Sequence, residues 1–206
     1  MRRWRPVALL ALGLTLANAL AIGIGRALPP NDQIIFEGDR AGIKDLLLAD
    51  VARAITVNLT RTPTVHEEHP AWSADGAQFA YIRQEADLNQ PRQVCVRRLS
   101  GMSERCLPPV ALWDDNPRWS PDGDWLLIES IDETFGNELY RLSLNDGRIE
   151  ALTQAVGNDM SAILAPDGRR IVFVSQRDGL RRLYMIDGDG TARPITSAAS
   201  NAMSPA

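Results

Sequence analysis

The sequence predicts an all-β protein built from a repeated unit, and three observations support this. A tight Asp-Gly turn recurs with its aspartates at Asp75, Asp122 and Asp167, so that successive copies are 47 and 45 residues apart. Each turn is followed by an apolar run of strand length, and no amphipathic helical pattern follows residue 28. A period of about 40–50 residues made of four short strands is the signature of propeller blades. The predicted fold is therefore a β-propeller of about four four-stranded blades.

The clearest copy of the repeat is N-P-R-W-S-P-D-G-D-W-L-L-I-E-S, from Asn116 to Ser130. Pro presets the φ angle at the first corner of a turn, and Gly supplies the positive φ that strains other residues. Related copies run from His69 to Ile82 and from Ser161 to Val174. Two unit tails that begin with Leu-Tyr end in a closing threonine, at Thr153 and Thr196. We interpret the repeated Asp-Gly pairs as turn formers rather than as cation ligands.

The order of these motifs resembles a known repeat. Pro-x-Trp-Ser-Pro-Asp-Gly, then I-x-F-x-S, then L-Y-x-x-D and a closing Leu/Ile-Thr is similar to the TolB-type β-propeller repeat, a bacterial branch of the WD-repeat-like propellers. The resemblance covers roughly Ile34 to Ala206. It implies a non-enzymatic binding or scaffold protein of the bacterial cell envelope that contacts other proteins. TolB itself carries an α/β domain before its propeller, which the segment preceding the repeats here does not match.

Residues 1–28 are expected to form a signal peptide or a signal-anchor helix. The opening M-R-R-W-R is positively charged, and Val7–Gly25 is uncharged and mostly apolar. Two interpretations stay open: cleavage after the A-x-A motif Ala17–Ala19, or retention as a membrane anchor, since about 20 apolar residues span the hydrocarbon core. The front arginines favour a cytoplasmic N-terminus. The predicted location is therefore extracytoplasmic, periplasmic or secreted, with a tether to the inner membrane if residues 7–25 are retained.

After a linker at residues 29–33, we expect propeller strands through the rest of the chain. The first unit lacks the hairpin arm that opens the others, which predicts a first blade without its inner strand. Residues 201–206 repeat the residues that precede Trp72 and Trp119, and they predict the start of a further repeat. Either this segment closes the ring beside the first blade, or the chain is a truncated part of a longer propeller or an incomplete ring. An incomplete ring exposes edges that another copy could cover. The units span residues 34–60, 70–107, 117–153 and 162–196.

Composition limits the classes of partner. The chain has 45% apolar residues, enough for a buried core in one domain, and a net charge of −4. Because residues 1–28 contain four arginines and no acid, the remainder is more acidic than the whole. Nucleic-acid binders carry basic patches, so this class is excluded. We expect an envelope protein or a basic or cationic ligand as partner, association with another copy as an alternative, and no cofactor.

The candidate ligand face lies where one unit connects to the next and where the second strand of a unit connects to its third. In a propeller these connections emerge on one face, which commonly binds ligands. Trp113 is the candidate aromatic anchor of this face, and an ordinary solvated surface is the alternative. The residues assigned to the face are Glu67, Glu68, Trp113, Asp114, Asp115, Asp132 and Glu133.

Neither metal chemistry nor catalysis is predicted. His66 and His69 are the only histidines, and their spacing differs from H-E-x-x-H; Pro70 also argues against a helix. Zinc sites need three or four converging ligands, so we interpret this stretch as a solvated loop leading into an inner strand. The sequence contains no G-x-S-x-G, P-loop or G-x-G-x-x-G motif. The alternative function is the propeller portion of a hydrolase or lyase, such as the accessory domain of a prolyl-oligopeptidase-type enzyme.

Cys95 and Cys106 are the only cysteines. They align with the third and fourth strands of the second unit, so they are expected to lie close to opposite each other. In an exported protein this arrangement favours a disulfide. Two small buried thiols that fill core positions are the alternative.

Overall fold

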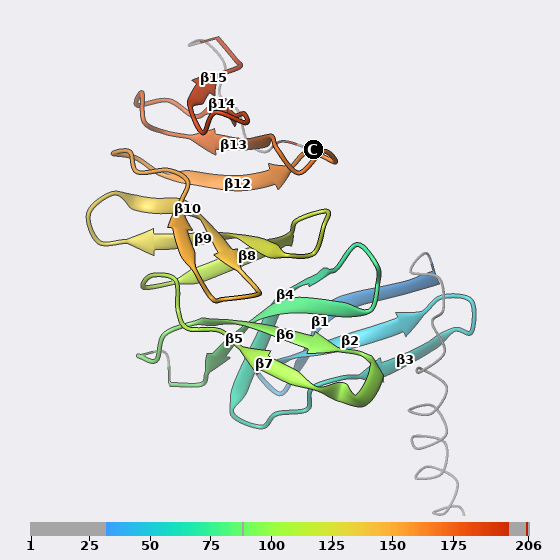
Figure 1. Ribbon diagram of the computed structural model, residues 1–206. Coiled ribbons are helices and arrows are strands. Elements are labelled where there is room, and N and C mark those ends of the chain that lie inside the picture. The colour runs from blue at the N-terminus through green and yellow to red at the C-terminus, as the bar shows by residue number, and fades with distance from the viewer. Residues whose placement is uncertain (1–31, 88, 198–204, 206) are drawn as a thin grey trace, which may run out of the picture.

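The structure, a computed structural model, describes residues 32–87, 89–197 and 205. In this part of the chain the fold is all-β, apart from one short 3-10 turn at Ser100–Met102. Four antiparallel sheets follow one another in chain order and form an open arc (Figure 1). The predicted all-β propeller architecture is confirmed.

We call the four sheets blades 1 to 4. Blade 1 contains β1 (Gln33–Arg40), β2 (Ile43–Asp50) and β3 (Ile55–Asn58). Blade 2 contains β4 (Val65–Trp72), β5 (Gln78–Glu85), β6 (Gln93–Arg98) and β7 (Glu104–Cys106). Blade 3 contains β8 (Asp114–Trp119), β9 (Trp125–Asp132), β10 (Gly136–Ser143) and β11 (Ile149–Ala151). Blade 4 contains β12 (Asp159–Leu164), β13 (Ile171–Ser175), β14 (Arg182–Ile186) and β15 (Ala192–Pro194).

Among the described residues blade 1 has three strands, and the strand that it lacks is the inner one, as predicted. The inner strand β4 of blade 2 packs against β1 and β2, just as the inner strand β12 of blade 4 packs against β9 and β10. β1 and β2 therefore occupy the places of the second and third strands of a complete blade. The predicted N-terminal helix and most of the predicted further repeat, residues 201–206, fall outside the described residues. Among the described residues, no helix has the length and apolar character needed to cross a membrane.

The repeated turns have one hydrogen-bond pattern. The Gly76 amide donates to the Ser73 carbonyl at 2.9 Å, and Gly123 and Gly168 make the equivalent bond at 3.0 and 2.9 Å. These three glycines have φ of 66, 78 and 68°, which only glycine adopts without strain. The Asp75 carboxylate accepts from the Ser73 hydroxyl and the Ala77 amide. The turn aspartates therefore stabilise the hairpin between the inner and second strands.

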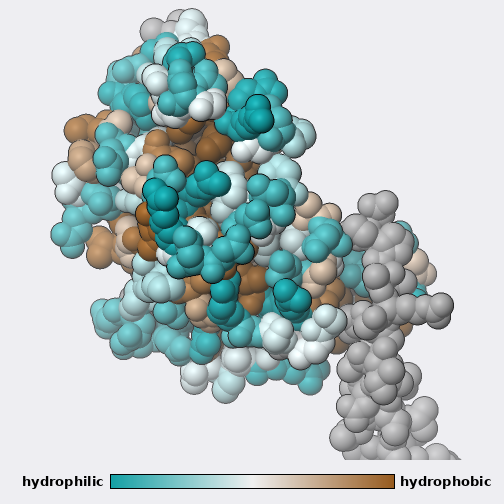
Figure 2. All heavy atoms as spheres, viewed as in Figure 1, coloured by the Kyte–Doolittle hydropathy of each residue, from teal (hydrophilic) through white to brown (hydrophobic). Residues whose placement is uncertain are grey.

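The apolar core lies between successive blades in three clusters. In β9, Leu126 and Ile128 pack against blade 2, whereas Leu127 packs with blade 4. All three side chains are at most 1% exposed, which explains why a second strand reads as a continuous apolar run. Figure 2 shows apolar side chains gathered between the blades with polar side chains around them.

The inner strands begin earlier than predicted. His66 and His69, expected in a solvated loop, lie within β4, which starts at Val65 rather than at Pro70. The backbone pairing with β5 extends from Val65 opposite Glu85 to Trp72 opposite Phe79, across a bulge. The hydropathy pattern did not indicate this extension, because its side chains are polar. The backbone hydrogen bonds that hold the strand do not depend on side-chain hydropathy.

Candidate binding face

The inner strands β4, β8 and β12 each contain a β-bulge. The bulge residues His69, Asn116 and Ser161 have φ of 51, 46 and 54°. Bulges re-aim side chains, and here the His69 amide donates to the Glu37 carboxylate of blade 1 at 2.8 Å. In the same way the Glu129 carboxylate of blade 3 accepts from the Ala162 amide of blade 4 at 3.0 Å. Carboxylates of one blade thus fix the inner strand of the next.

Around the first bulge, five charged side chains form what we call the Arg92 cluster: Lys44, Glu68, His69, Arg92 and Asp115. The Arg92 guanidinium is 2.6 Å from the Glu68 carboxylate and 3.7 Å from that of Asp115. The Lys44 ammonium is 2.7 Å from the other Glu68 oxygen. The Arg92 side chain is only 5% exposed. Because the members come from blades 1, 2 and 3, the cluster ties these three blades together.

The His69 imidazole is hydrogen-bonded to the Asp115 carboxylate. This bond raises the pKa of His69, against the opposing effect of burial. Burial would raise the pKa of Asp115, but the His69 hydrogen bond and the Arg92 charge outweigh it and lower that pKa. The carboxylates of Glu68 and Asp115 are therefore already paired with cations of the same chain. In this part of the predicted acidic face, acidic and basic side chains therefore neutralise one another.

Two predicted face residues are buried and hold loops. Glu67 is 2% exposed, bonds the Thr62 hydroxyl, and has a pKa raised by burial. Asp114 is fully buried and accepts from the Val110 amide at 2.9 Å and from the Ser130 hydroxyl at 2.7 Å. Sequence reasoning placed both residues in exposed connections. They lie instead within β4 and at the start of β8, because both strands begin earlier than their polar residues indicated.

Trp113 lies beside an exposed apolar pair. Its ring centroid is 5.2 Å from the Arg92 guanidinium carbon, a cation–π contact that holds the half-buried indole. Leu112 and Ile131 are 52% and 43% exposed, and the Leu112 amide donates to the Ile131 carbonyl at 3.1 Å. Glu133, two residues after Ile131 in the chain, is exposed. We call Leu112, Trp113, Ile131 and Glu133 the blade 3 patch.

The remaining predicted residue, Asp132, closes the hairpin between β9 and β10. Its carboxylate accepts from the Thr134 amide at 2.7 Å and from the Phe135 amide at 3.1 Å. Leu112 and Ile131 were missed by the sequence reasoning, although an apolar residue in a connection beside Trp113 was a usable signal. The ligand-binding roles of Glu68, Trp113, Asp115, Asp132 and Glu133 stay predictions.

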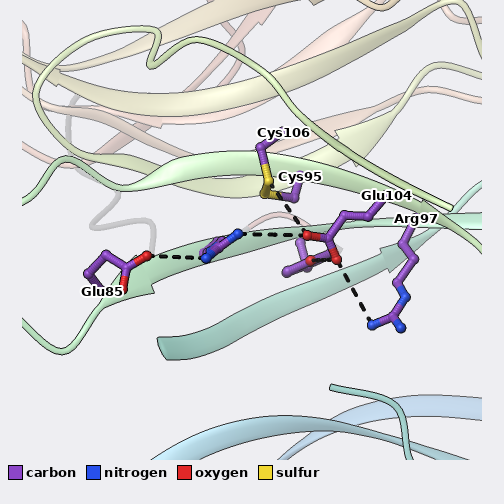
Figure 3. The surroundings of a disulfide bond; sticks show 7 residues. Glu85, Cys95, Arg97, Glu104 and Cys106 are labelled. Atoms are coloured by element: carbon purple, nitrogen blue, oxygen red, sulfur yellow. Dashed lines mark hydrogen bonds and ion pairs between the residues drawn. A yellow bond between two sulfur atoms is a disulfide. The ribbon is translucent and has the colours of Figure 1, made fainter. Parts of the chain in front are cut away.

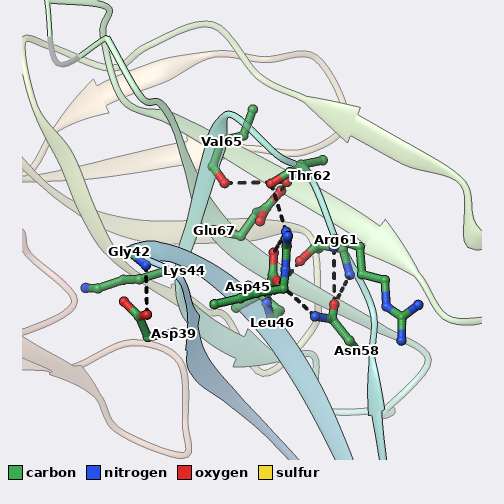
Figure 4. A network of polar contacts seen from close by, with 12 residues as sticks. Asp39, Gly42, Lys44, Asp45, Leu46, Asn58, Arg61, Thr62, Val65 and Glu67 are labelled. Atoms are coloured by element: carbon green, nitrogen blue, oxygen red, sulfur yellow. Dashed lines mark hydrogen bonds and ion pairs between the residues drawn. The ribbon is translucent and has the colours of Figure 1, made fainter.

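A second polar network, around Asp45 in blade 1, was not indicated by the sequence (Figure 4). Asp45, fully buried in β2, accepts from the Arg40 guanidinium at 2.8 Å and from the Asn58 amide group at 2.7 Å. The other end of Asn58 accepts from the Thr60 and Arg61 amides. The hydrogen bond from Arg40 lowers the pKa of Asp45 in spite of its burial. This network fixes the connection from blade 1 to blade 2 and is structural.

Cys95 in β6 is the register partner of Cys106 in β7, and a disulfide joins their sulfur atoms (Figure 3). The Cα atoms are 3.9 Å apart. Together with Glu104 the two cysteines are the one group of three potential metal-ligating side chains in the described part of the chain. A disulfide lacks the thiolates that bind metal ions, and the Glu104 carboxylate already accepts from the Tyr81 hydroxyl at 2.6 Å.

Comparison with protein families decides what this repeat is. The model of the TolB beta propeller domain matches residues 45–206, most of the chain. The chain belongs to the TolB β-propeller family. A protein TolB homolog of Chlorobium luteolum is 25% identical over 181 residues, which cover 86% of this chain and 39% of that protein.

Solved structures share the fold of this TolB-family chain. TolB from Acinetobacter baumannii superposes with a TM-score of 0.69 at 18% identity, over 84% of this chain and 43% of that one. A puromycin hydrolase superposes with a TM-score of 0.63 at 16% identity, over 82% of this chain and 30% of the hydrolase. At these identities the likeness shows the fold alone. The chain spans about two fifths of the length of its TolB relatives.

Proposed function

We propose that this TolB-family propeller is an exported, non-enzymatic binding module of the bacterial cell envelope, which holds a partner protein on its blade 3 patch. Family membership supports the binding role, since TolB-type propeller domains mediate contacts between proteins. The charged start and the apolar run at residues 7–25 support export. The extracytoplasmic location belongs to the same proposal.

The observation that carries the proposal is the exposure of two aliphatic side chains around a held tryptophan. Leu112 and Ile131 are 52% and 43% exposed beside Trp113. Binding energy concentrates in a few large apolar or aromatic side chains surrounded by a polar rim. Because Arg92 already fixes the indole, little side-chain entropy is lost when a partner binds there. The exposed Glu133 favours a partner with an apolar anchor flanked by basic residues.

The test starts with the partner in its own environment. A photo-crosslinking amino acid at Leu112, in the full chain expressed in the source bacterium, should trap one envelope protein that mass spectrometry identifies. The same group at Val156, which is 79% exposed in the connection between blades 3 and 4, is the matched control. The control position should not trap that protein.

The purified partner then gives the quantitative result. Trp113→Ala should weaken binding by about 2 kcal/mol or more, roughly 30-fold in Kd, measured by calorimetry. Val156→Ala should leave the Kd unchanged. An equal Kd for Trp113→Ala and the unaltered chain, with both variants folded by circular dichroism, would remove the blade 3 patch as the binding site.

A further inference from the structure

A cleft of about 480 Å³ lies between blades 2 and 3, at the end of the strands where the turn of Gly123 lies. This volume is within the range of about 300–1,000 Å³ that is typical of ligand sites. The floor of the cleft is apolar, since Val96 and Leu144 line it and are only 8% and 9% exposed. Its rim contains Arg98 and Arg105 of blade 2, both exposed. The cleft therefore combines an apolar floor with two cations on its rim.

Blade 4 shows how an arginine at this place in the repeat is paired. The strand register places Arg105 at the position of Arg193 in blade 4, and Arg98 at the position of Asp187. The Arg193 guanidinium is 2.9 Å from the Asp187 carboxylate, so side chains at these two positions reach each other. Blade 2 has a second arginine in place of the carboxylate. A carboxylate is therefore the group that blade 2 lacks at this place.

The two arginines bring like charges together on one face of blade 2. One Arg105 N–H group donates to the Leu144 carbonyl at 2.7 Å, which leaves its other donors for a ligand. Arg98 makes no ion pair and no side-chain hydrogen bond with the described residues. Like charges at neighbouring positions of two strands destabilise a sheet. Blade 3 has Ser143 and Glu150 at the same two positions, so the repeat does not require this pair of arginines.

Two acidic side chains near the rim are already engaged with other groups. Glu104 lines the cleft, but its carboxylate accepts from the Tyr81 hydroxyl at 2.6 Å. The pKa of Asp75 is lowered mainly by the hydrogen bond from the Ser73 hydroxyl, and the Arg98 charge is the smallest of the causes. Neither carboxylate therefore takes the place that Asp187 has in blade 4.

We propose that this cleft binds a peptide C-terminus whose last residue is aliphatic. The terminal carboxylate lies between Arg98 and Arg105, in the place that the Asp187 side chain has in blade 4. Guanidinium groups present a planar fork of N–H donors that fits a carboxylate. The aliphatic side chain covers Val96 and Leu144, the apolar floor. The bound carboxylate also offsets the repulsion between the two arginines.

This site goes beyond the proposed function and is separate from the blade 3 patch. Strand β9 begins at Trp125, beside the turn of Gly123, and ends at Asp132. The patch residue Ile131 lies at the far end of this strand from the cleft. The cleft and the patch share no residue, so the failure of one leaves the other intact.

The first test is an NMR titration of the isotope-labelled full chain with N-acetyl-L-leucine. This probe has a carboxylate and an aliphatic side chain, and its acetyl group stands for the preceding peptide bond. The amide resonances of Gly123 and Asn145 should shift and reach saturation. The amide of Gly168, which forms the equivalent turn in blade 4, should not move.

Three further probes separate the charge, the shape and the source of the ligand. N-acetyl-L-leucinamide has the same shape but no charge, and it should bind at least about tenfold more weakly. Inorganic phosphate has charge but no aliphatic group, and it should also bind more weakly than N-acetyl-L-leucine. Free L-leucine adds an ammonium group beside the two arginines, so it should bind more weakly than the acetylated form.

The matched variants are Arg98→Gln and Arg169→Gln. Arg98→Gln removes one of the two cations of the cleft and should weaken binding of N-acetyl-L-leucine at least about tenfold. Arg169→Gln removes the same charge from a turn of blade 4 and should leave the affinity unchanged. Both side chains are exposed, so both variants should fold.

Five results would overturn the proposal. A Gly123 shift that does not saturate would show that the cleft binds no such carboxylate. Equal affinity for the neutral amide, or of Arg98→Gln for N-acetyl-L-leucine, would show that the arginines do not recognise the carboxylate. Equal or tighter binding of phosphate would assign the cleft to a simple anion. Equal or tighter binding of free L-leucine would assign it to an amino acid rather than to a peptide.

Discussion

Closing threonines hold the outer strand of three blades to the third strand. The hydroxyl oxygens of Thr60, Thr153 and Thr196 accept from the backbone amides of Leu46, Leu139 and Leu183 at 3.0, 2.9 and 3.1 Å. In blade 2, Leu107 is followed by Pro108 instead, and that blade has the disulfide between the same two strands. One residue type at a fixed place in the repeat therefore satisfies a buried backbone donor that the strand ladder leaves unpaired.

Thr153→Val tests this role. Valine keeps the shape of threonine but removes the acceptor, so the Leu139 amide is left buried and unpaired. The free energy of unfolding in urea should fall by about 1–3 kcal/mol. Thr134→Val, at an exposed turn position, should change it by less than about 0.5 kcal/mol. Equal stabilities of the two variants would contradict the role of the hydroxyl.

His69 makes the stability of the inner strands depend on pH. Its pKa is raised by the Asp115 hydrogen bond, so the folded state holds the proton more tightly than the unfolded state. The stabilisation is complete below the ordinary histidine pKa of about 6.5 and is lost as the pH rises through the raised folded-state value. The unaltered chain should therefore exceed His69→Gln in unfolding free energy by more at about pH 5.5 than at about pH 8.5.

Asp115→Asn is the control for this pH effect. Without the carboxylate, the added substitution His69→Gln should cost nearly the same at both pH values. Urea unfolding at each pH gives the unfolding free energy of the unaltered chain, of the two single variants and of the double variant. If the loss caused by His69→Gln in the unaltered chain does not vary with pH, the His69–Asp115 pair does not contribute through protonation.

The hairpin of β6 and β7 is the element with a covalent link. The cysteines are 11 residues apart, and they join the outermost short strand of blade 2 to its neighbour. A disulfide stabilises mainly by restricting the unfolded chain, typically by about 2–4 kcal/mol. We predict that the protein contains no titratable thiol and that reduction lowers its unfolding free energy by about this amount.

A serine double variant separates the bond from other effects of the reductant. The chain with Cys95→Ser and Cys106→Ser should be less stable than the unaltered chain, and it should not respond to reductant. Thiol titration of the native and denatured protein gives the redox state directly. Two thiols in the unreduced, denatured protein would show that the cysteines are buried thiols instead.

In the whole molecule, stability is distributed along an arc in which each blade contacts its neighbours. Apolar clusters join successive blades, and the Arg92 cluster spans blades 1 to 3. The two end blades keep exposed apolar side chains, such as Phe36 and Ile195. A propeller normally removes such surfaces by closing its ring.

The repeat unit, its turns, the all-β class and the missing inner strand of blade 1 were determined by the sequence, because they depend on local signals. Gly and Pro act at single turn positions, and apolar runs mark strands buried on both faces. The Leu-Tyr and Thr positions recur because each blade needs the same local contacts at these positions.

The composition of the binding face was decided only by the tertiary structure. Glu68 and Asp115 looked like free acidic groups until Arg92 and Lys44, remote in sequence or on another blade, proved to pair with them. Glu67 and Asp114 are buried because strand pairing extended β4 and β8 through polar residues. Hydropathy describes one residue at a time, whereas exposure and ion pairing depend on which blade packs against it.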